Sequence, residues 1–117
     1  MRVWDVQPKL LCRQHLLGEH RELHGLWNIL TKHKGKGGYS NHPETKRWVG
    51  KLKALFNRHE LLVREMERRG YVHRSPLDKR FAKGSVRQNV YIDPIAKQKQ
   101  LLHAKPCECY FSTTKKA

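Results

Sequence analysis

The stretch LLCRQHLLGEHRELHGLWNILTKHK, residues 10–34, decides the fold. Leu16, Leu23 and Leu30 recur every seven residues, and Trp27 falls on the same side. This spacing predicts one amphipathic helix with a single apolar stripe facing a core. The glycine-rich run GKGGYSNHP, which begins at Gly35, then ends the helical pattern.

Two more helices are expected after that break. A second helix should begin near Asn41 or His42, with Pro43 in its first turn, and should stop at Gly70. The remaining predictions are a long loop over residues 71–93 and a short third helix over residues 93–105. We therefore predict an all-α fold, a compact single domain of about three helices with long loops. The domain spans residues 1–117, with a flexible tail at 112–117.

The composition points to a polyanionic partner. The 117 residues suffice for one domain, and 25 Lys and Arg against 10 Asp and Glu give a formal charge of +15. Every third of the chain is basic, so the excess is not a tail. A compact body this positive is typical of nucleic-acid binding, and a basic ribosome-associated or thermophile-type protein without chemistry is the alternative.

The chain carries no apolar run long enough for a membrane span and no signal-peptide pattern. We expect an intracellular monomer, in the cytoplasm or nucleoid, with no membrane partner.

Metal and nucleotide motifs are incomplete. GKGGYS lacks the G-K-[ST] ending of a phosphate-binding loop. HRELH places His20 and His24 one turn apart, but zinc proteases have their glutamate directly after the first histidine. Cys107 and Cys109 in CEC have no second cysteine pair with which to form a zinc site. We therefore predict no metal and no cofactor, and interpret His20 as a packed or interfacial histidine.

The polar side of the first helix is more informative. Gln14 aligns with Arg21, and His15 with Glu22, each pair two turns or roughly 10 Å apart. Glycines at 18 and 25 flank the glutamate, and each costs about 1 kcal/mol relative to alanine in a helix. Something must therefore approach closely here, either another helix or a nucleic-acid backbone. A carboxylate facing a sugar–phosphate chain is repelled unless it stabilises a cation or moves a proton.

RQHLLGEHREL, so close to the N-terminus, resembles the pyrimidine-dimer DNA glycosylases of the bacteriophage endonuclease V type, which are also abasic-site lyases. The resemblance continues through TKHKGKG and EMERRGY and covers roughly residues 1–72. It implies a compact three-helix enzyme in which the free α-amino group attacks the deoxyribose and a helix-1 glutamate is indispensable. That glutamate is Glu22. The phage-type enzymes have another arginine after it, where this chain has His24 and Gly25, and their aromatic tail contains a tryptophan that KPCECYF lacks.

The resemblance also assigns the nucleophile. In the family member whose methionine is removed, the second residue attacks, but this chain is one residue shorter before QH, so Met1 takes that place. Met1 followed by the bulky Arg2 should be retained. An α-amino group has an ordinary pKa of about 8, so a useful fraction is neutral and nucleophilic. Attack on the sugar produces a protonated imine, which the Glu22 carboxylate would stabilise.

We therefore expect a DNA repair glycosylase with abasic-site lyase activity that acts on damaged double-stranded DNA and displaces a nucleotide. The alternative functions are a lyase without base excision, and a non-enzymatic DNA- or RNA-binding module in which Glu22 braces Arg21. Residues expected to bind DNA or support the site are Arg2, Arg13, Gln14, His15, Arg21, Lys32, Lys34, Lys46, Arg47 and Lys51.

Overall fold

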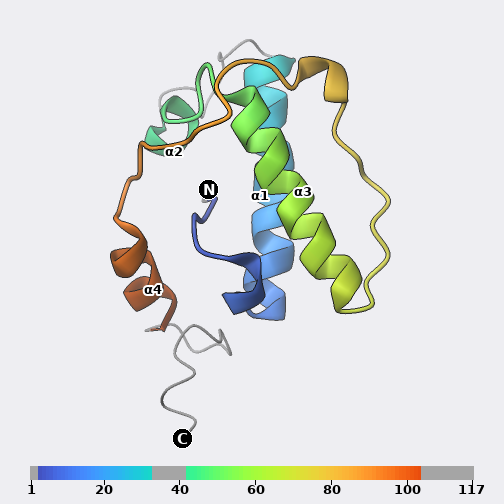
Figure 1. Ribbon diagram of the computed structural model, residues 1–117, viewed down its shortest axis with the longest axis vertical. Helices are drawn as coiled ribbons and strands as arrows, with labels where there is room; N and C mark the ends of the chain where they lie inside the picture. Colours follow the sequence, from blue (N-terminus) through green and yellow to red (C-terminus); the bar gives the residue numbers. More distant parts are fainter. Residues whose placement is uncertain (1–2, 33–41, 104–117) are drawn as a thin grey trace, which may run out of the picture.

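Two long helices packed side by side form the centre of the computed structural model, which describes residues 3–32 and 42–103 (Figure 1). They are α1, Arg13–Thr31, and α3, Leu52–Arg68. The shorter helices are α2, Pro43–Lys46, and α4, Ile95–His103. Single 3-10 turns cover Pro8–Leu10 and Lys79–Phe81. No strand forms in these two ranges, which confirms the all-α prediction.

Helix α1 forms where the leucine spacing predicts it, but it begins three residues late. Pro8–Leu10 make a separate 3-10 turn, and Cys12 then caps α1 by accepting a hydrogen bond from the His15 amide at 3.4 Å. The predicted end at Lys34 lies outside the described residues. Leu16 and Leu23 are fully buried, and Leu30 packs partly buried against the same core.

The predicted second helix is two helices. It begins as expected at Pro43, but the chain turns after Lys46 and passes through Gly50, whose φ is +75°. Helix α3 then begins at Leu52 and ends before Gly70, whose φ is +89°. The Gly70 stop is therefore confirmed, while the continuous helix is wrong.

The loop after α3 stabilises the break at Gly50. The first backbone N–H groups of a helix have no partner inside the helix. Here the Lys53 and Ala54 amides donate to the carbonyl oxygens of Lys83 and Ser85, at 2.8 and 3.1 Å. The Ser85 amide in turn donates to the Gly50 oxygen at 3.0 Å. A side chain at Gly84 would place its Cβ 2.3 Å from that oxygen, so only glycine fits there.

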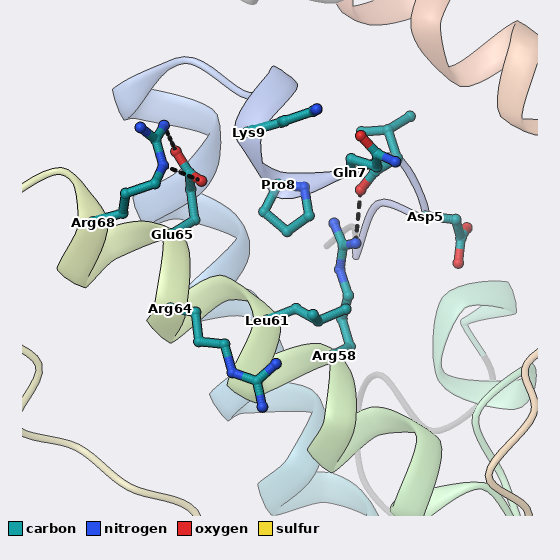
Figure 2. A pocket seen from close by; sticks show the side chains of 10 residues that line it. Asp5, Gln7, Pro8, Lys9, Arg58, Leu61, Arg64, Glu65 and Arg68 are labelled. Carbon is teal, nitrogen blue, oxygen red and sulfur yellow. Dashed lines mark hydrogen bonds and ion pairs between the residues drawn. The ribbon is translucent and has the colours of Figure 1, made fainter.

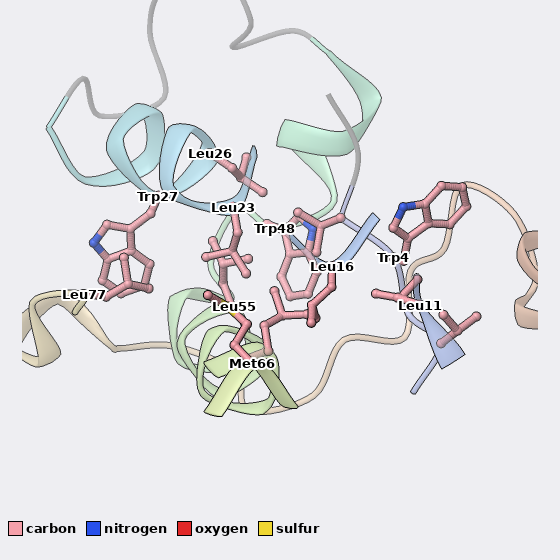
Figure 3. Close-up of a cluster of buried hydrophobic side chains, with 14 of the residues drawn as sticks. Trp4, Leu11, Leu16, Leu23, Leu26, Trp27, Trp48, Leu55, Met66 and Leu77 are labelled. Carbon is pink, nitrogen blue, oxygen red and sulfur yellow. The ribbon is translucent and has the colours of Figure 1, made fainter. Parts of the chain in front are cut away.

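One core fills the space between α1, α3 and the N-terminal segment (Figure 3). Helices α1 and α3 face each other through apolar rows that include Leu23 and Leu55, both fully buried. The N-terminal segment adds buried Val3, Trp4 and Val6. In the described parts of the chain, no helix combines the length and the apolar character needed to cross a membrane.

Candidate active site

The side of α1 away from α3 carries the residues that the sequence singles out. Gln14 and Arg21 are exposed, and His15 and Glu22 are half-buried. His15 lies against the N-terminal segment, with its ring 6.2 Å from that of Trp4, edge to face. Its Nδ1 also lies 3.1 Å from the Cys12 sulfur. We call the set of Gln14, His15, Arg21 and Glu22, with the two glycines beside them, the outer face of α1.

Two glutamates one turn apart on α1 differ in burial and in hydrogen-bond partners. Glu19 is buried and receives two hydrogen bonds from the Arg58 guanidinium, at 2.7 and 2.9 Å. Burial raises the pKa of Glu19 above its ordinary value, although the Arg58 charge opposes this. Glu22 makes no side-chain hydrogen bond or ion pair with residues 3–32 or 42–103, and this includes Arg21. Its carboxylate does not brace that arginine.

Gly18 and Gly25 lie on open surface. Apart from the adjacent residues and the nearby backbone of α1 itself, a Cβ built at either position meets no atom within 4 Å among the parts of the protein that the structure describes. Helix α3 packs on the other side of α1, where the leucines are. The close approach that would justify two helical glycines is therefore not made by another helix of the described structure, and the outer face is free for a ligand.

The N-terminal segment is fixed along α1 by two buried arginines. Arg47 donates to the Val3 carbonyl oxygen at 2.7 Å and forms an ion pair with Asp5 at 3.1 Å. Arg58 donates to the Val6 oxygen at 2.7 Å while it holds Glu19. The Trp4 backbone also hydrogen-bonds to the Glu19 carboxylate. Residues 3–6 are therefore fixed in position rather than a loose end.

This arrangement corrects the expectation for Arg47. We expected this basic residue to contact DNA, but Arg47 is 5% exposed, and its guanidinium also bonds to Glu44 at 2.7 Å and to the Val90 oxygen at 2.9 Å. Hydrogen bonds with Glu44 help to raise the pKa of Arg47 against the effect of burial. A guanidinium with every direction occupied inside the protein is not available to a phosphate.

The other predicted DNA-binding residues lie as follows. Arg13, Lys32 and Lys46 are exposed. Lys51 is half-buried and donates through Nζ to Gln88 at 2.8 Å. Met1, Arg2 and Lys34 lie outside the described residues.

A cavity of about 540 Å³ lies between residues 5–9 and α3, with Pro8 and Leu61 on its two sides (Figure 2). None of the predicted catalytic or DNA-binding residues lines it. Arg58, which does line it, is already engaged by Glu19 and Val6. The outer face of α1, not this cavity, is therefore the better candidate for the chemistry.

Four histidines converge on the opposite side of α1. His20 and His24 meet His59 of α3 and His73 of the following loop, and their ligand nitrogens all lie within 4.8 Å of one another. Burial, and then the neighbouring imidazole charges, lower the pKa of His20 to about 4. Burial also lowers the pKa values of His24 and His59. The sequence prediction included the first pair but missed His59 and His73, which no local motif links to it.

The fold and the outer face of α1 define a basic helical protein with an available carboxylate on its first long helix. The family model for pyrimidine dimer DNA glycosylase matches residues 1–79, which include α1, α2 and α3, and the chain belongs to that family. No curated protein and no solved structure matches the chain.

Proposed function

We propose that the protein is a DNA glycosylase with abasic-site lyase activity that forms a Schiff base through the α-amino group of Met1. Family membership supports base excision at pyrimidine dimers. The observation that carries the lyase mechanism is the pairing of a fixed N-terminal segment with the available carboxylate of Glu22. A positioned amine and a carboxylate are the two groups that this reaction needs.

The spacing along α1 supports this pairing. Trp4 lies level with Glu19, since its backbone bonds to that carboxylate. Glu22 is three residues further along α1, a rise of about 4.5 Å. Two residues of extended chain before Val3 can span about 7 Å. The α-amino group of Met1 can therefore reach the level of Glu22 without any change in the segment held by Arg47 and Arg58.

In the proposed reaction, the neutral amine attacks C1′ of the displaced nucleotide's sugar, and the damaged base leaves with the bonding electron pair. Opening of the sugar ring gives a protonated imine. The Glu22 carboxylate stabilises this cation and moves the protons of ring opening and of β-elimination, in which C2′ loses a proton and the C3′–O bond breaks. Exposed Arg13, Arg21, Lys32 and Lys46 are proposed to bind phosphates, with Gln14 beside them.

Borohydride trapping with an abasic duplex tests this proposal. The wild-type protein should give a covalent adduct that peptide mapping places on Met1. An added N-terminal tag should abolish trapping, and proteolytic removal of the tag that regenerates Met1 should restore it. Trapping by the tagged protein, or an adduct on a lysine, would refute the α-amino assignment.

Glu22→Gln tests the carboxylate, and Glu67→Gln on the exposed surface of α3 is the matched control. Loss of the charge should reduce strand cleavage roughly 100-fold or more, as expected for a general acid/base group. DNA affinity should be retained, since the carboxylate repels phosphate. Equal cleavage by both variants would show that Glu22 is not the catalytic carboxylate. Absence of cleavage in the wild type as well would favour the non-enzymatic binding module.

A further inference from the structure

We infer that His20, His24, His59 and His73 form a structural binding site for one divalent transition-metal ion, best fitted by Zn²⁺. This four-histidine cluster is separate from the proposed active site. At 100° per residue, His20 and His24 lie roughly 160–200° around α1 from Glu22. The inference therefore does not depend on the proposed function.

The nitrogen positions carry the inference. The Nε2 atom of His59 lies 3.2 Å from that of His20 and 3.1 Å from that of His24, and the His73 and His20 Nε2 atoms are 3.1 Å apart. Four nitrogens at 2.0–2.1 Å from a tetrahedral zinc ion are about 3.3 Å apart. These three of the six nitrogen–nitrogen distances match that spacing, and all six are within 4.8 Å.

The rings are arranged as evenly as their nitrogens. Five of the ring pairs have centroids 4.7, 5.0, 5.0, 5.0 and 5.2 Å apart. Packing of imidazoles as apolar groups does not require four Nε2 atoms to face one point. Coordination of a common ion does.

Hydrogen bonding within the cluster satisfies these nitrogens poorly. The Nδ1 atom of His59 lies 2.7 Å from the Glu60 carboxylate, which can only accept, so Nδ1 carries the proton and Nε2 has the lone pair. That single in-plane lone pair faces two Nε2 neighbours, and only one of them can donate along it. A cation accepts all four lone pairs at once.

The surroundings of the histidines also suit a metal site. The Glu60–His59 contact is the carboxylate–histidine pairing that fixes the tautomer of metal ligands and raises their basicity. The Ser75 backbone hydrogen-bonds to His24. Imidazole ligands favour Zn²⁺, Cu²⁺, Ni²⁺ and Fe²⁺, and four neutral nitrogens in a tetrahedron favour zinc among them.

The position of His73 indicates what the ion would do. His73 opens the long segment between α3 and α4, whereas the other three ligands lie on the packed helices α1 and α3. Four protein ligands leave no open position for a substrate or water, as in structural zinc sites. The ion would therefore join the start of this loop to the α1–α3 pair, next to Leu77, which is buried in the core.

Metal binding to the full-length chain, stripped with a chelator and then titrated, tests the inference. We expect one Zn²⁺ per chain, a higher Tm with added Zn²⁺, and the visible absorption of tetrahedral Co²⁺ when Co²⁺ replaces it. X-ray absorption at the zinc edge should show nitrogen neighbours without sulfur. Substoichiometric binding, or sulfur neighbours from the cysteines, would overturn the inference.

Variants assign the ion to the cluster. His73→Gln and His24→Gln should each weaken Zn²⁺ affinity roughly 100-fold or more, since loss of an outer partner alone costs 10–100-fold. His42→Asn, which removes an imidazole elsewhere but keeps an N-cap acceptor for Glu44, should bind like wild type. If a cluster variant does not fold, the wild-type stoichiometry and spectra still decide. Unchanged affinity in both cluster variants would place the ion elsewhere.

Discussion

Alanine at Gly18 and Gly25 is expected to make the protein more stable and less active. Both glycines lie inside α1, where glycine costs about 1 kcal/mol relative to alanine. Beyond the adjacent residues and the nearby backbone of α1, no described atom lies within 4 Å of an added Cβ at either position, so no clash offsets the gain. Each substitution should raise the free energy of unfolding by about 1 kcal/mol. The double variant should gain about 2 kcal/mol, since the positions are roughly 10 Å apart and independent.

Activity should change in the opposite direction. The two methyl groups would stand on the outer face of α1, on either side of the Glu22 carboxylate along the helix. A docked sugar–phosphate backbone would be held away from that carboxylate. A displacement of about 1 Å can cost roughly 100-fold in a reaction that depends on position. We therefore expect the double variant to cleave abasic duplex DNA at least about 10-fold more slowly in a single turnover.

Urea denaturation and single-turnover cleavage measure the two effects separately. Asn57→Ala, at an exposed position of α3, is the control, because it improves helix propensity away from the outer face of α1. It should stabilise the protein and leave cleavage unchanged. If the double glycine variant is more stable and cleaves at the wild-type rate, DNA does not approach these glycines and our reasoning for this face is wrong.

Three further predictions concern charge. Affinity for duplex DNA should fall with salt with a log–log slope of roughly −5, as for contact with six or so phosphates, and a slope near zero in filter binding would exclude a phosphate-binding role. Arg47→Met should lower the free energy of unfolding, measured in urea, by about 3–5 kcal/mol, because the carboxylates of Asp5 and Glu44 would lose their cationic partner in a buried site. A loss below about 1 kcal/mol would contradict the role of Arg47 as a structural ion-pair partner. Hydrogen bonds and charges from Arg68 and Arg69 lower the pKa of Glu65 from 4.5. The stability that these ion pairs give is therefore present above pH 4.5 and is lost as the pH falls through the lowered pKa. Glu65→Gln should therefore make the free energy of unfolding depend less on pH below pH 4.5. If the variant is less stable but has the same pH dependence as the wild type, these ion pairs do not titrate in that range.

Local patterns were sufficient for much of the fold. The leucine spacing located α1, Gly70 ended α3 as expected, and α4 lies within the predicted range 93–105, because helix periodicity and helix stop signals are properties of neighbouring residues. The interruption before α3 was missed because it depends on contacts with residues 83–85, which no local pattern reveals.

The same rule applies to the candidate site, whose function stays a prediction. The sequence indicated the outer face of α1 because its residues share one helix. The role of Arg47 was not predictable, since its partner Val3 is 44 positions away. The same limit hid the cluster of histidines, in which His20 meets His73 at a separation of 53 positions.

The two arginines that hold residues 3–6 also set an order of folding. During synthesis, residues 3–6 are made before Arg58, their anchor at Val6, which follows 52 residues later. The segment can dock only after α3 has formed against α1. The entropy cost of closing a loop of that length is offset only by contacts with the finished helix pair. Any opening that releases α3 also releases the Val6 anchor, even while α1 persists. Under the proposed mechanism, a nascent or partly unfolded chain would lack the positioned amine that the reaction needs.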